Sequence, residues 1–397
     1  MKFLKKLKSK KHLLSGLKSK LKILVIVILS CLLIFIAYSF LSNLTNMLNY
    51  STGNYSDANR KIYESKLDSN NIFIFVRDKS SGYELITGFF VLQQNPSTRN
   101  FKLLNISTTA IVAESKYGSN MEVSKILQYM KLKGDSVNDF ISFWENYIAL
   151  KSDGYIIIDR EYIKDFHTYI GPLTVSNEYD SNNFKKGRVE ITNSNFDSFW
   201  NNEYSNEGQR LVNDNKYMVE MLKRFGNLDF LLSFSKLSLS TKEHIFTNIE
   251  ITDFRSLISD LVSSANKITL NFTPTNIYNV VSGSRYVDQE KFDKYIRENF
   301  SDKAILREQV RIEVLNASNE KGLATKVGRY LSNAGLSINR TGNFSVEVSK
   351  NTIYIKDSKK YIKTTEYLKK IFTDADFKYE SPEKLSTADI LILVKSF

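Results

Sequence analysis

The residue types that most often carry chemistry are sparse in this chain. The single cysteine, Cys31, lies inside an apolar run, and the three histidines, His12, His167 and His244, are far apart in the sequence. A cysteine-based metal site needs several thiolates, and a zinc site needs ligands at short spacing. The sequence therefore excludes a cysteine-based metal site, argues against a zinc site and leaves the chain without a disulfide.

A polar cluster at residues 107–109, Ser-Thr-Thr, follows a short apolar run at 101–106. Two similar runs come before it, at 71–76 and 84–94, and all three have the length of a strand. Strands this close in the sequence can be joined by tight hairpins, which predicts an antiparallel meander. The hydroxyl groups of the cluster would then lie at the end of the third strand.

Helical and strand patterns alternate after this cluster. Apolar side chains recur on one helical face in four segments, and a buried strand is expected at 153–159. The helical segments are 137–148, 163–170, 218–225 and 254–262. Each apolar stripe is typical of a helix that packs on a core rather than of a ligand site. Residues 70–300 are therefore predicted to form one mixed-sheet α/β domain.

The composition changes near the C-terminal end. Residues 301–308 form a charged stretch, which we expect to be a linker without a core. Beyond it, an alternating strand, an amphipathic helix, further strands and a second helix predict a small two-layer α/β domain over 309–397. Gly322 and Gly335 have the spacing of helix caps and turns, so the chain contains no glycine-rich phosphate loop.

The first residues predict a membrane anchor. Residues 1–22 contain nine lysines and no acidic residue, and residues 23–41 carry no charge. A helix over 23–41 would be about 28 Å long, close to the ~30 Å hydrocarbon core of a bilayer. The apolar region of a cleaved signal peptide is shorter, about 7–15 residues, so a retained transmembrane helix is favoured. Residues 42–69, rich in Asn, Ser and Tyr, are expected to form a stalk.

The position of the lysines predicts the topology and explains the charge. Because they flank the apolar span on one side only, residues 1–22 are expected in the cytoplasm and the C-terminal region outside the membrane. These lysines carry nine of the twelve net positive charges of the chain. The body of the protein is therefore almost neutral, and the pI of about 9.3 does not indicate nucleic-acid binding. The lysines are expected to lie against anionic lipid headgroups.

Several segments together resemble the LytR-CpsA-Psr family of bacterial envelope proteins, including the family's C-terminal LytR-type domain. Residues 310–338 resemble the opening of that C-terminal domain, with a strand, a Leu-Asn-Ala-Ser turn and Gly-Leu-Ala on a helix. Upstream, the segments NIFIFVRD at 71–78, GYIIIDREYIKDFHTYIGPLTV at 154–175 and IFTNIEITDFRSLI at 245–258 are similar to family segments in the same order. The resemblance covers about residues 70–397.

The resemblance implies a specific chemistry. Proteins of this family are membrane-anchored phosphotransferases that move a glycopolymer from a polyprenyl-pyrophosphate carrier to a hydroxyl group of peptidoglycan. Arginines suit the pyrophosphate because they form charge-assisted, bidentate hydrogen bonds with its oxygens. Carboxylates place Mg²⁺ on the same oxygens, and catalysis of phosphoryl transfer is mainly positioning and charge stabilisation.

Most of the charged residues that the resemblance implies are replaced in this chain. The aspartate of one family signature falls on Thr87, and the arginine and aspartate of a second fall on Thr108 and Thr109. In a third signature, the second arginine is Asn213 and the glutamine is Asp214. No arginine occurs between residues 100 and 159, so a shift of the alignment does not restore the lost pair.

Three positions keep the residue that the family has. Asp78 matches the aspartate after the first strand and would be the only ligand left for Mg²⁺, while Glu207 and Arg210 match the third signature. Charged residues nearby could substitute for the lost ones. These are Arg77, Glu84 and Lys125.

The sequence therefore leaves two hypotheses open. The favoured one is a non-catalytic envelope protein of this family that binds a polyprenyl lipid, a cell-wall polymer or another envelope protein, without a cofactor and without nucleic acid. The alternative is an active phosphotransferase with a rebuilt site and Mg²⁺ as its cofactor. A transferase would need Asp78 and Arg210 to face one pocket.

Overall fold

The computed structural model describes residues 62, 67, 69–95, 98–115, 118–201, 204, 206–224, 244–264, 267–380 and 386–397. The predicted basic tail, transmembrane span and most of the stalk lie outside these residues. Within the described ranges, no helix is long and apolar enough to cross a bilayer. Two stalk residues that are described, Ile62 and Leu67, are buried.

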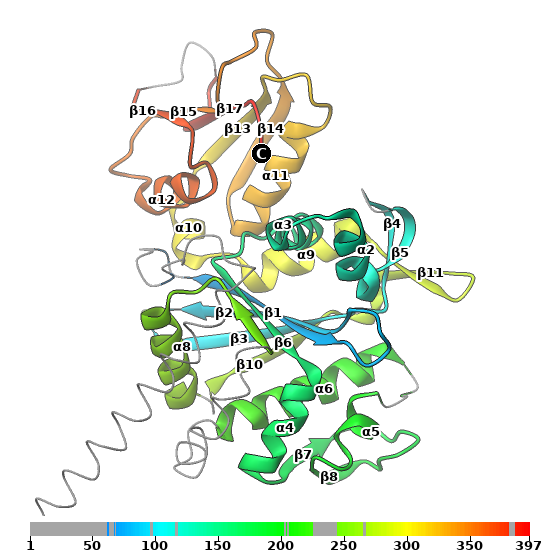
Figure 1. Ribbon diagram of the computed structural model, residues 1–397. Helices are drawn as coiled ribbons and strands as arrows, with labels where there is room; N and C mark the ends of the chain where they lie inside the picture. Colours follow the sequence, from blue (N-terminus) through cyan, green and yellow to red (C-terminus); the bar gives the residue numbers. More distant parts are fainter. Residues whose placement is uncertain are drawn as a thin grey trace, which may run out of the picture.

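A six-stranded mixed sheet forms the centre of the first domain, with the order β10-β3-β2-β1-β6-β9. Its strands are β1 (Asn70–Asp78), β2 (Leu85–Asn95), β3 (Asn100–Ile106), β6 (Gly154–Asp159), β9 (Ile245–Thr247) and β10 (Thr269–Phe272). The first three strands pair antiparallel, which confirms the predicted meander. β1 and β6 pair in parallel through a helical crossover. The central strands are almost wholly buried because helices cover both faces of the sheet (Figure 1).

Two apolar cores lie on the two faces of this sheet. One core is shared with α4 (Arg160–Ile170), α5 (Phe196–Trp200), α6 (Glu207–Arg224) and α8 (Ile251–Ser264). The other is shared with α2 (Ile126–Lys133), α3 (Val137–Ile148) and α9 (Gln289–Phe300). The expected helices at 137–148 and 163–170 therefore exist, and their apolar stripes pack on the sheet as predicted.

Two smaller sheets extend the first domain. β4 (Ile111–Ser115), β5 (Gly118–Glu122), β11 (Tyr278–Val281) and β12 (Ser284–Val287) form one of them, in the order β11-β12-β4-β5. β7 (Leu173–Asn177) and β8 (Gly187–Ile191) form the other. β12 pairs with β4, so the end of the first domain returns to the chain that follows β3.

The C-terminal domain is built on a five-stranded sheet with the order β14-β13-β17-β15-β16 (Figure 1). Its strands are β13 (Arg311–Asn316), β14 (Ser337–Asn343), β15 (Thr352–Ile355), β16 (Asp376–Lys378) and β17 (Ile390–Val394). Its helices are α10 (Lys303–Glu308), α11 (Leu323–Ala334) and α12 (Ile362–Ile371), which contribute apolar residues to the main core of the domain.

The segment expected to be a linker differs from the prediction. Residues 303–308 form helix α10, whose first backbone N–H groups are capped by the Asp302 carboxylate. Ala304 and Ile305 are buried, and Ile305 belongs to the core of the C-terminal domain. The charged residues of this segment occupy the other face of the helix, which concealed its apolar side in the sequence.

Candidate functional site

The predicted site residues meet at one edge of the central sheet. β1 runs parallel to β6 and antiparallel to β2, which is antiparallel to β3, so β1, β3 and β6 end at the same edge. Asp78 ends β1 and Asp159 ends β6, while Ser107 directly follows β3. Neighbouring strands are about 4.8 Å apart, which places the ends of β1 and β3 roughly 10 Å from each other.

The ends of β1 and β6 carry an ion-pair cluster, here called the β1/β6 cluster, of Arg77, Asp78, Asp159 and Arg160. The guanidinium of Arg77 is buried and donates from Nε to Oδ1 of Asp159 at 2.6 Å. A second nitrogen of Arg77 lies 3.4 Å from Glu84, and the group stacks 4.6 Å from the ring centre of Phe246. Arg77 is therefore held inside the protein and does not face a ligand.

Asp78 is likewise occupied by partners within the chain. Its Oδ2 lies 2.7 Å from Nη1 of Arg160, and its Oδ1 accepts a 2.8 Å hydrogen bond from the backbone N–H of Ser80. Arg160 also donates to Oδ1 of Asn201 at 3.1 Å. Both oxygens of the carboxylate that matches the family thus have donors already.

Asp159 gathers several cations and keeps its charge. Besides Arg77, it contacts Nζ of Lys79 and Nδ1 of His244, each at 3.0 Å. Burial acts to raise the pKa of Asp159, but the hydrogen bonds and charge of Arg77, with His244 and Lys79, hold it below the ordinary value. The positive charges of the β1/β6 cluster are consequently neutralised within the protein.

A second cluster, here called the β3/α6 cluster, joins Ser107, Glu207, Arg210 and Asp214. Arg210 contacts both oxygens of Glu207, at 3.0 Å from Nε and 2.5 Å from Nη2, and donates from Nη1 to Asp214 at 2.8 Å. The three residues are spaced by three and four positions on α6, which places them on one face of the helix. Ser107 donates to Oε1 of Glu207 at 2.7 Å and shares a 3.1 Å hydrogen bond with Thr109.

One guanidinium in this cluster serves two buried carboxylates. Burial acts to raise the pKa of Glu207, but the charge and hydrogen bonds of Arg210, with Ser107 and Arg285, hold it below the ordinary value. Burial raises the pKa of Asp214 to about 7, because the opposing effect of Arg210 is partly offset by the charge of Glu207. Glu207 is therefore ionised, and Asp214 is partly protonated at neutral pH.

Two arginines that the sequence did not predict complete these clusters. Arg160 directly follows strand β6, and a charged residue directly after a buried strand is a feature of the sequence that indicates a position at the sheet edge. Arg285 lies on β12, with Nη1 3.7 Å from Glu207 and a side chain that is 34% exposed. No local signal marks Arg285, because only the pairing of β12 with β4 brings it to the cluster.

The positions where the family has charged residues are only partly grouped. Thr87 accepts a 3.2 Å hydrogen bond from the indole of Trp200, and Thr108 is buried. Thr109 is exposed beside Ser107. Asn213 is fully buried and accepts a hydrogen bond from the backbone of Glu178 at 2.9 Å, beyond the end of β7. Asn213 therefore packs on that hairpin rather than on Arg210.

The suggested substitutes are also paired elsewhere. Lys125 forms an exposed ion pair with Glu122 at 2.9 Å, and Glu84 binds Lys131 at 2.5 Å as well as Arg77. Asp78 and Arg210, which a transferase would bring to one pocket, belong to different clusters on β1 and α6.

The residues present do not fit a magnesium site. Across the ranges that the structure describes, no group of three or more His, Cys, Asp or Glu side chains could hold a metal ion. Mg²⁺ takes carboxylate oxygens in near-octahedral geometry. Each oxygen of Asp78 already accepts one contact, from Arg160 or from the N–H of Ser80, and the positive charge of Arg160 beside it disfavours a second cation there.

The C-terminal residues match a known family. Residues 309–396 match the family model described as "LytR cell envelope-related transcriptional attenuator". A comparison with curated proteins finds no match.

Solved structures also show likenesses to this chain. TagV from B. subtilis is 18% identical, with a TM-score of 0.45 over 59% of this chain and 97% of TagV. TagU from B. subtilis is 12% identical, with a TM-score of 0.44 over 59% of this chain and 98% of TagU. A structure of TagT bound to LI-WTA is 12% identical, with a TM-score of 0.44 over 57% and 88% of the two chains. By the family match, residues 309–396 form a LytR C-terminal domain, as the strand, turn and helix of residues 310–338 predicted.

Proposed function

We propose that this chain is a membrane-anchored envelope protein of divergent LytR-CpsA-Psr type that binds a lipid or a cell-wall polymer and transfers nothing. The proposal places residues 1–22 in the cytoplasm, a single span at 23–41 and the remainder outside the membrane. The LytR C-terminal domain supports a role in the cell envelope. The upstream segments that resemble the family support the same assignment for residues 70–300.

The observation that carries the proposal is the neutralisation of charge at the sheet edge. Arg77, Arg160 and Arg210 each bind carboxylates of the same chain at 2.5–2.7 Å. Where the family has a further arginine and aspartate after β3, this chain has Thr108 and Thr109. A pyrophosphate would have to displace internal carboxylates from the arginines and leave those carboxylates buried and unpaired, which is strongly unfavourable.

The hydroxyl groups at this edge favour a less charged ligand. Ser107 and Thr109 are hydrogen-bonded to each other, and Thr109 is exposed. Hydroxyl groups both donate and accept hydrogen bonds, but they do not compensate several negative charges. A polyprenyl chain would bind through apolar contacts that do not depend on the lost charges.

One observation favours the alternative of an active phosphotransferase. Arg285, which comes from another part of the chain, stands 3.7 Å from Glu207 and is 34% exposed. It could replace one of the two arginines that are lost from the family signatures, the one at Thr108 after β3 or the one at Asn213 on α6. Its partner Glu207 is already bound by Arg210, however.

Binding of lipid headgroups tests the proposal. The full-length chain in nanodiscs would be titrated with polyprenyl phosphate and polyprenyl pyrophosphate, each with and without Mg²⁺. Each charge-assisted hydrogen bond contributes about 1.5–3 kcal/mol. The two lost arginines together would contribute about 3–6 kcal/mol. A site that kept them would bind the pyrophosphate about two to four orders of magnitude more tightly than the phosphate. We expect a preference below about tenfold and no effect of Mg²⁺.

A matched control isolates the sheet edge in this experiment. Arg311→Ala removes an exposed arginine that pairs with Asp389 in the C-terminal domain, far from the clusters in sequence and fold. Arg285→Ala removes the exposed cation beside Glu207. A strong, Mg²⁺-dependent preference for pyrophosphate that is lost in Arg285→Ala and kept in Arg311→Ala would reject the proposal and favour the transferase.

A further inference from the structure

The C-terminal end of α3 is completed by side chains of the other domain. A helix leaves its last carbonyl groups without partners inside the helix. α3 ends at Ile148, and Ala149 follows in the left-handed region with φ of 51°. The carbonyl groups of the last turn point toward α11, which lies beside α9 and α3 in Figure 1.

Arg329 of α11 binds these carbonyl groups with its guanidinium. Nη1 donates to the carbonyl of Asn146 at 2.6 Å, and Nη2 donates to that of Tyr147 at 2.8 Å. The same guanidinium forms a two-point ion pair with Asp293 of α9, at 2.6 and 2.9 Å. A cation at a helix C-terminus is also favoured by the helix dipole.

A second side chain of α11 extends this contact. Asn333 is fully buried and donates to the carbonyl of Ile148 at 3.1 Å and to Asp293 at 3.3 Å. Tyr330 donates to the side-chain oxygen of Asn146 at 3.1 Å. Three consecutive carbonyl groups of α3, at 146, 147 and 148, thus depend on residues of the C-terminal domain.

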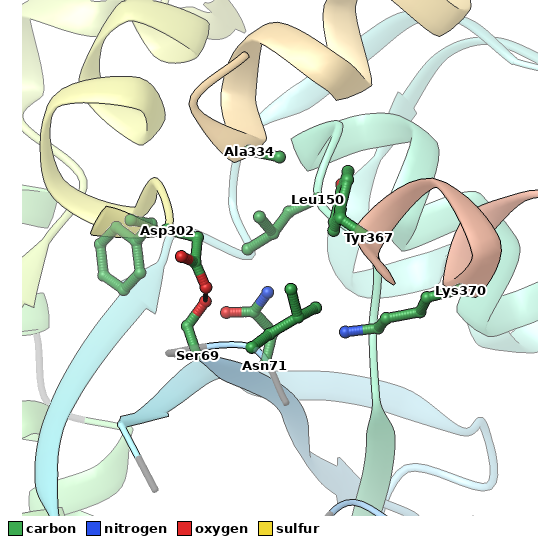
Figure 2. A pocket seen from close by; sticks show the side chains of 9 residues that line it. Ser69, Asn71, Leu150, Asp302, Ala334, Tyr367 and Lys370 are labelled. Carbon is green, nitrogen blue, oxygen red and sulfur yellow. Dashed lines mark hydrogen bonds between the residues drawn. The ribbon is translucent and has the colours of Figure 1, made fainter. Parts of the chain in front are cut away.

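The opposite side of the junction is closed by α12 and by the segment that leads into β1. Lys370 of α12 forms an ion pair with Asp153, whose other oxygen accepts a 2.8 Å hydrogen bond from the backbone of Asn71 in β1. Figure 2 shows Lys370 and Asn71 beside a small cavity, where Ser69 donates to Asp302 at 2.8 Å. The cavity has a volume of about 10 Å³, enough for about one water molecule.

The segment before β1 also enters the core of the C-terminal domain. Leu67 is only 4% exposed and belongs to the same apolar cluster as Ile312, Val327 and Leu368 of that domain. Leu67 and Ser69, which precede β1, therefore both contact the C-terminal side of the junction.

We propose that the LytR C-terminal domain acts as a structural cap of the upstream domain, with Arg329 and Asn333 as the C-terminal cap of α3. Without these side chains, Asp293 would lose its cation, although it is only 7% exposed. The carbonyl groups of Asn146 and Ile148 would lose these donors as well, and that of Tyr147 would keep only a 3.5 Å hydrogen bond from Gln289 of α9. A buried polar or charged group that loses its charged partner strongly destabilises the folded protein.

Aromatic side chains connect α3 to the strands that carry the candidate site. Phe140 and Trp144 of α3 pack on Phe75 of β1 at ring distances of 4.8 and 5.6 Å. Trp144 also lies 4.3 Å from Phe89 of β2. Phe75 is three residues from Asp78, so a loosened α3 would remove support from the strands that end at the sheet edge.

Hydrogen exchange of the full-length chain tests this inference. In Arg329→Ala, amides in the last turn of α3, around residues 145–150, should exchange about ten- to a hundredfold faster than in the wild type, as loss of charge-assisted hydrogen bonds predicts. Amides of β13 and β17, inside the C-terminal domain, should change little. The matched control is Arg311→Ala, which removes a two-point arginine–aspartate pair that lies within the C-terminal domain.

A conservative variant keeps the test decisive if Arg329→Ala does not fold. Arg329→Lys retains the positive charge, but its single nitrogen with three donors cannot reproduce the four hydrogen bonds that the planar guanidinium makes. It should accelerate exchange at the end of α3 to an intermediate degree. The control Arg311→Ala sets the exchange rate expected at residues 145–150 when α3 keeps its cap. The inference would be overturned if Arg329→Ala, or Arg329→Lys where Arg329→Ala does not fold, showed the same rate as this control.

Discussion

At the scale of single residues, the sheet edge is governed by Arg210 and its two carboxylates. Glu207 and Asp214 are both buried, and Arg210 contacts both of them. One positive charge cannot compensate two buried negative charges, so one carboxyl group keeps its proton more readily. That group is Asp214, whose pKa is raised to about 7.

This arrangement predicts a pH dependence of stability. A carboxyl group with a raised folded-state pKa binds more protons in the folded than in the unfolded chain. Its contribution to stability is therefore complete below its unfolded pKa near 4 and is lost as the pH rises through about 7. Compared with Asp214→Asn, the wild type should lose about 1.4 kcal/mol of unfolding free energy per pH unit between about pH 5 and 7.

Denaturant unfolding at several pH values measures this difference. The control is Asp389→Asn, because the hydrogen bond from Arg311 holds the pKa of Asp389 below its ordinary value. The stability due to Asp389 is present above its unfolded pKa and is lost only as the solution becomes more acidic. Parallel pH profiles of the wild type and Asp214→Asn between pH 5 and 7 would contradict the assigned protonation of Asp214.

The sequence predicts some of the residues of the two ion-pair clusters but not all of them. Asp78, Glu207 and Arg210 could be found because each lies in a segment that resembles a family signature. Arg285 could not, since it reaches Glu207 only through the pairing of distant strands. Asn213 was assigned to the same group as Arg210, but the structure places its amide oxygen against the backbone N–H of Glu178, beyond the end of β7.

At the scale of elements, the start of β6 depends on a close approach to the segment after β9. A Cβ atom added to Gly154 would lie 2.5 Å from Cγ1 of Ile249, whose side chain is 3% exposed. A buried, β-branched side chain has few other rotamers to adopt. Only glycine therefore fits at the first residue of the strand that ends in Asp159.

Replacing this glycine should destabilise the fold. Gly154→Ala is expected to lower the free energy of unfolding by about 1–3 kcal/mol, the usual cost of overpacking a core. Gly342→Ala is the control, because its added Cβ would come no closer than 3.4 Å to another atom. Thermal unfolding of both variants measures the effect, and equal midpoints would refute the close approach at Gly154.

Element prediction succeeded where the apolar pattern was continuous or periodic. The runs that became β1, β2 and β3 and the stripe of α3 are apolar enough to be recognised alone. Helix α10 was missed because only Ala304 and Ile305 are buried among six residues. The sequence predicts the end of α3 at residue 148 but not its capping partner, since Arg329 lies 181 positions after Ile148 in the chain.

At the scale of the whole molecule, the proposed anchor predicts how intact cells protect the chain. Protease added outside the cells should digest the region beyond about residue 60 and leave a small fragment that contains the proposed span at 23–41. Mass spectrometry of the membrane fraction would identify this fragment. A mature chain that begins after Leu41 would show that the apolar segment is a cleaved signal peptide.

We propose that this chain does not perform the transfer reaction that its resemblance to the family implies. The most direct measurement is turnover of a polyprenyl-pyrophosphate-linked glycopolymer by the full-length chain, with peptidoglycan as acceptor and Mg²⁺ present or absent. We expect no release of the pyrophosphate headgroup above the background without protein, in either condition. Turnover that requires Mg²⁺ and disappears in Asp78→Ala or Arg210→Ala, while Arg311→Ala retains it, would refute the proposed function and establish a phosphotransferase.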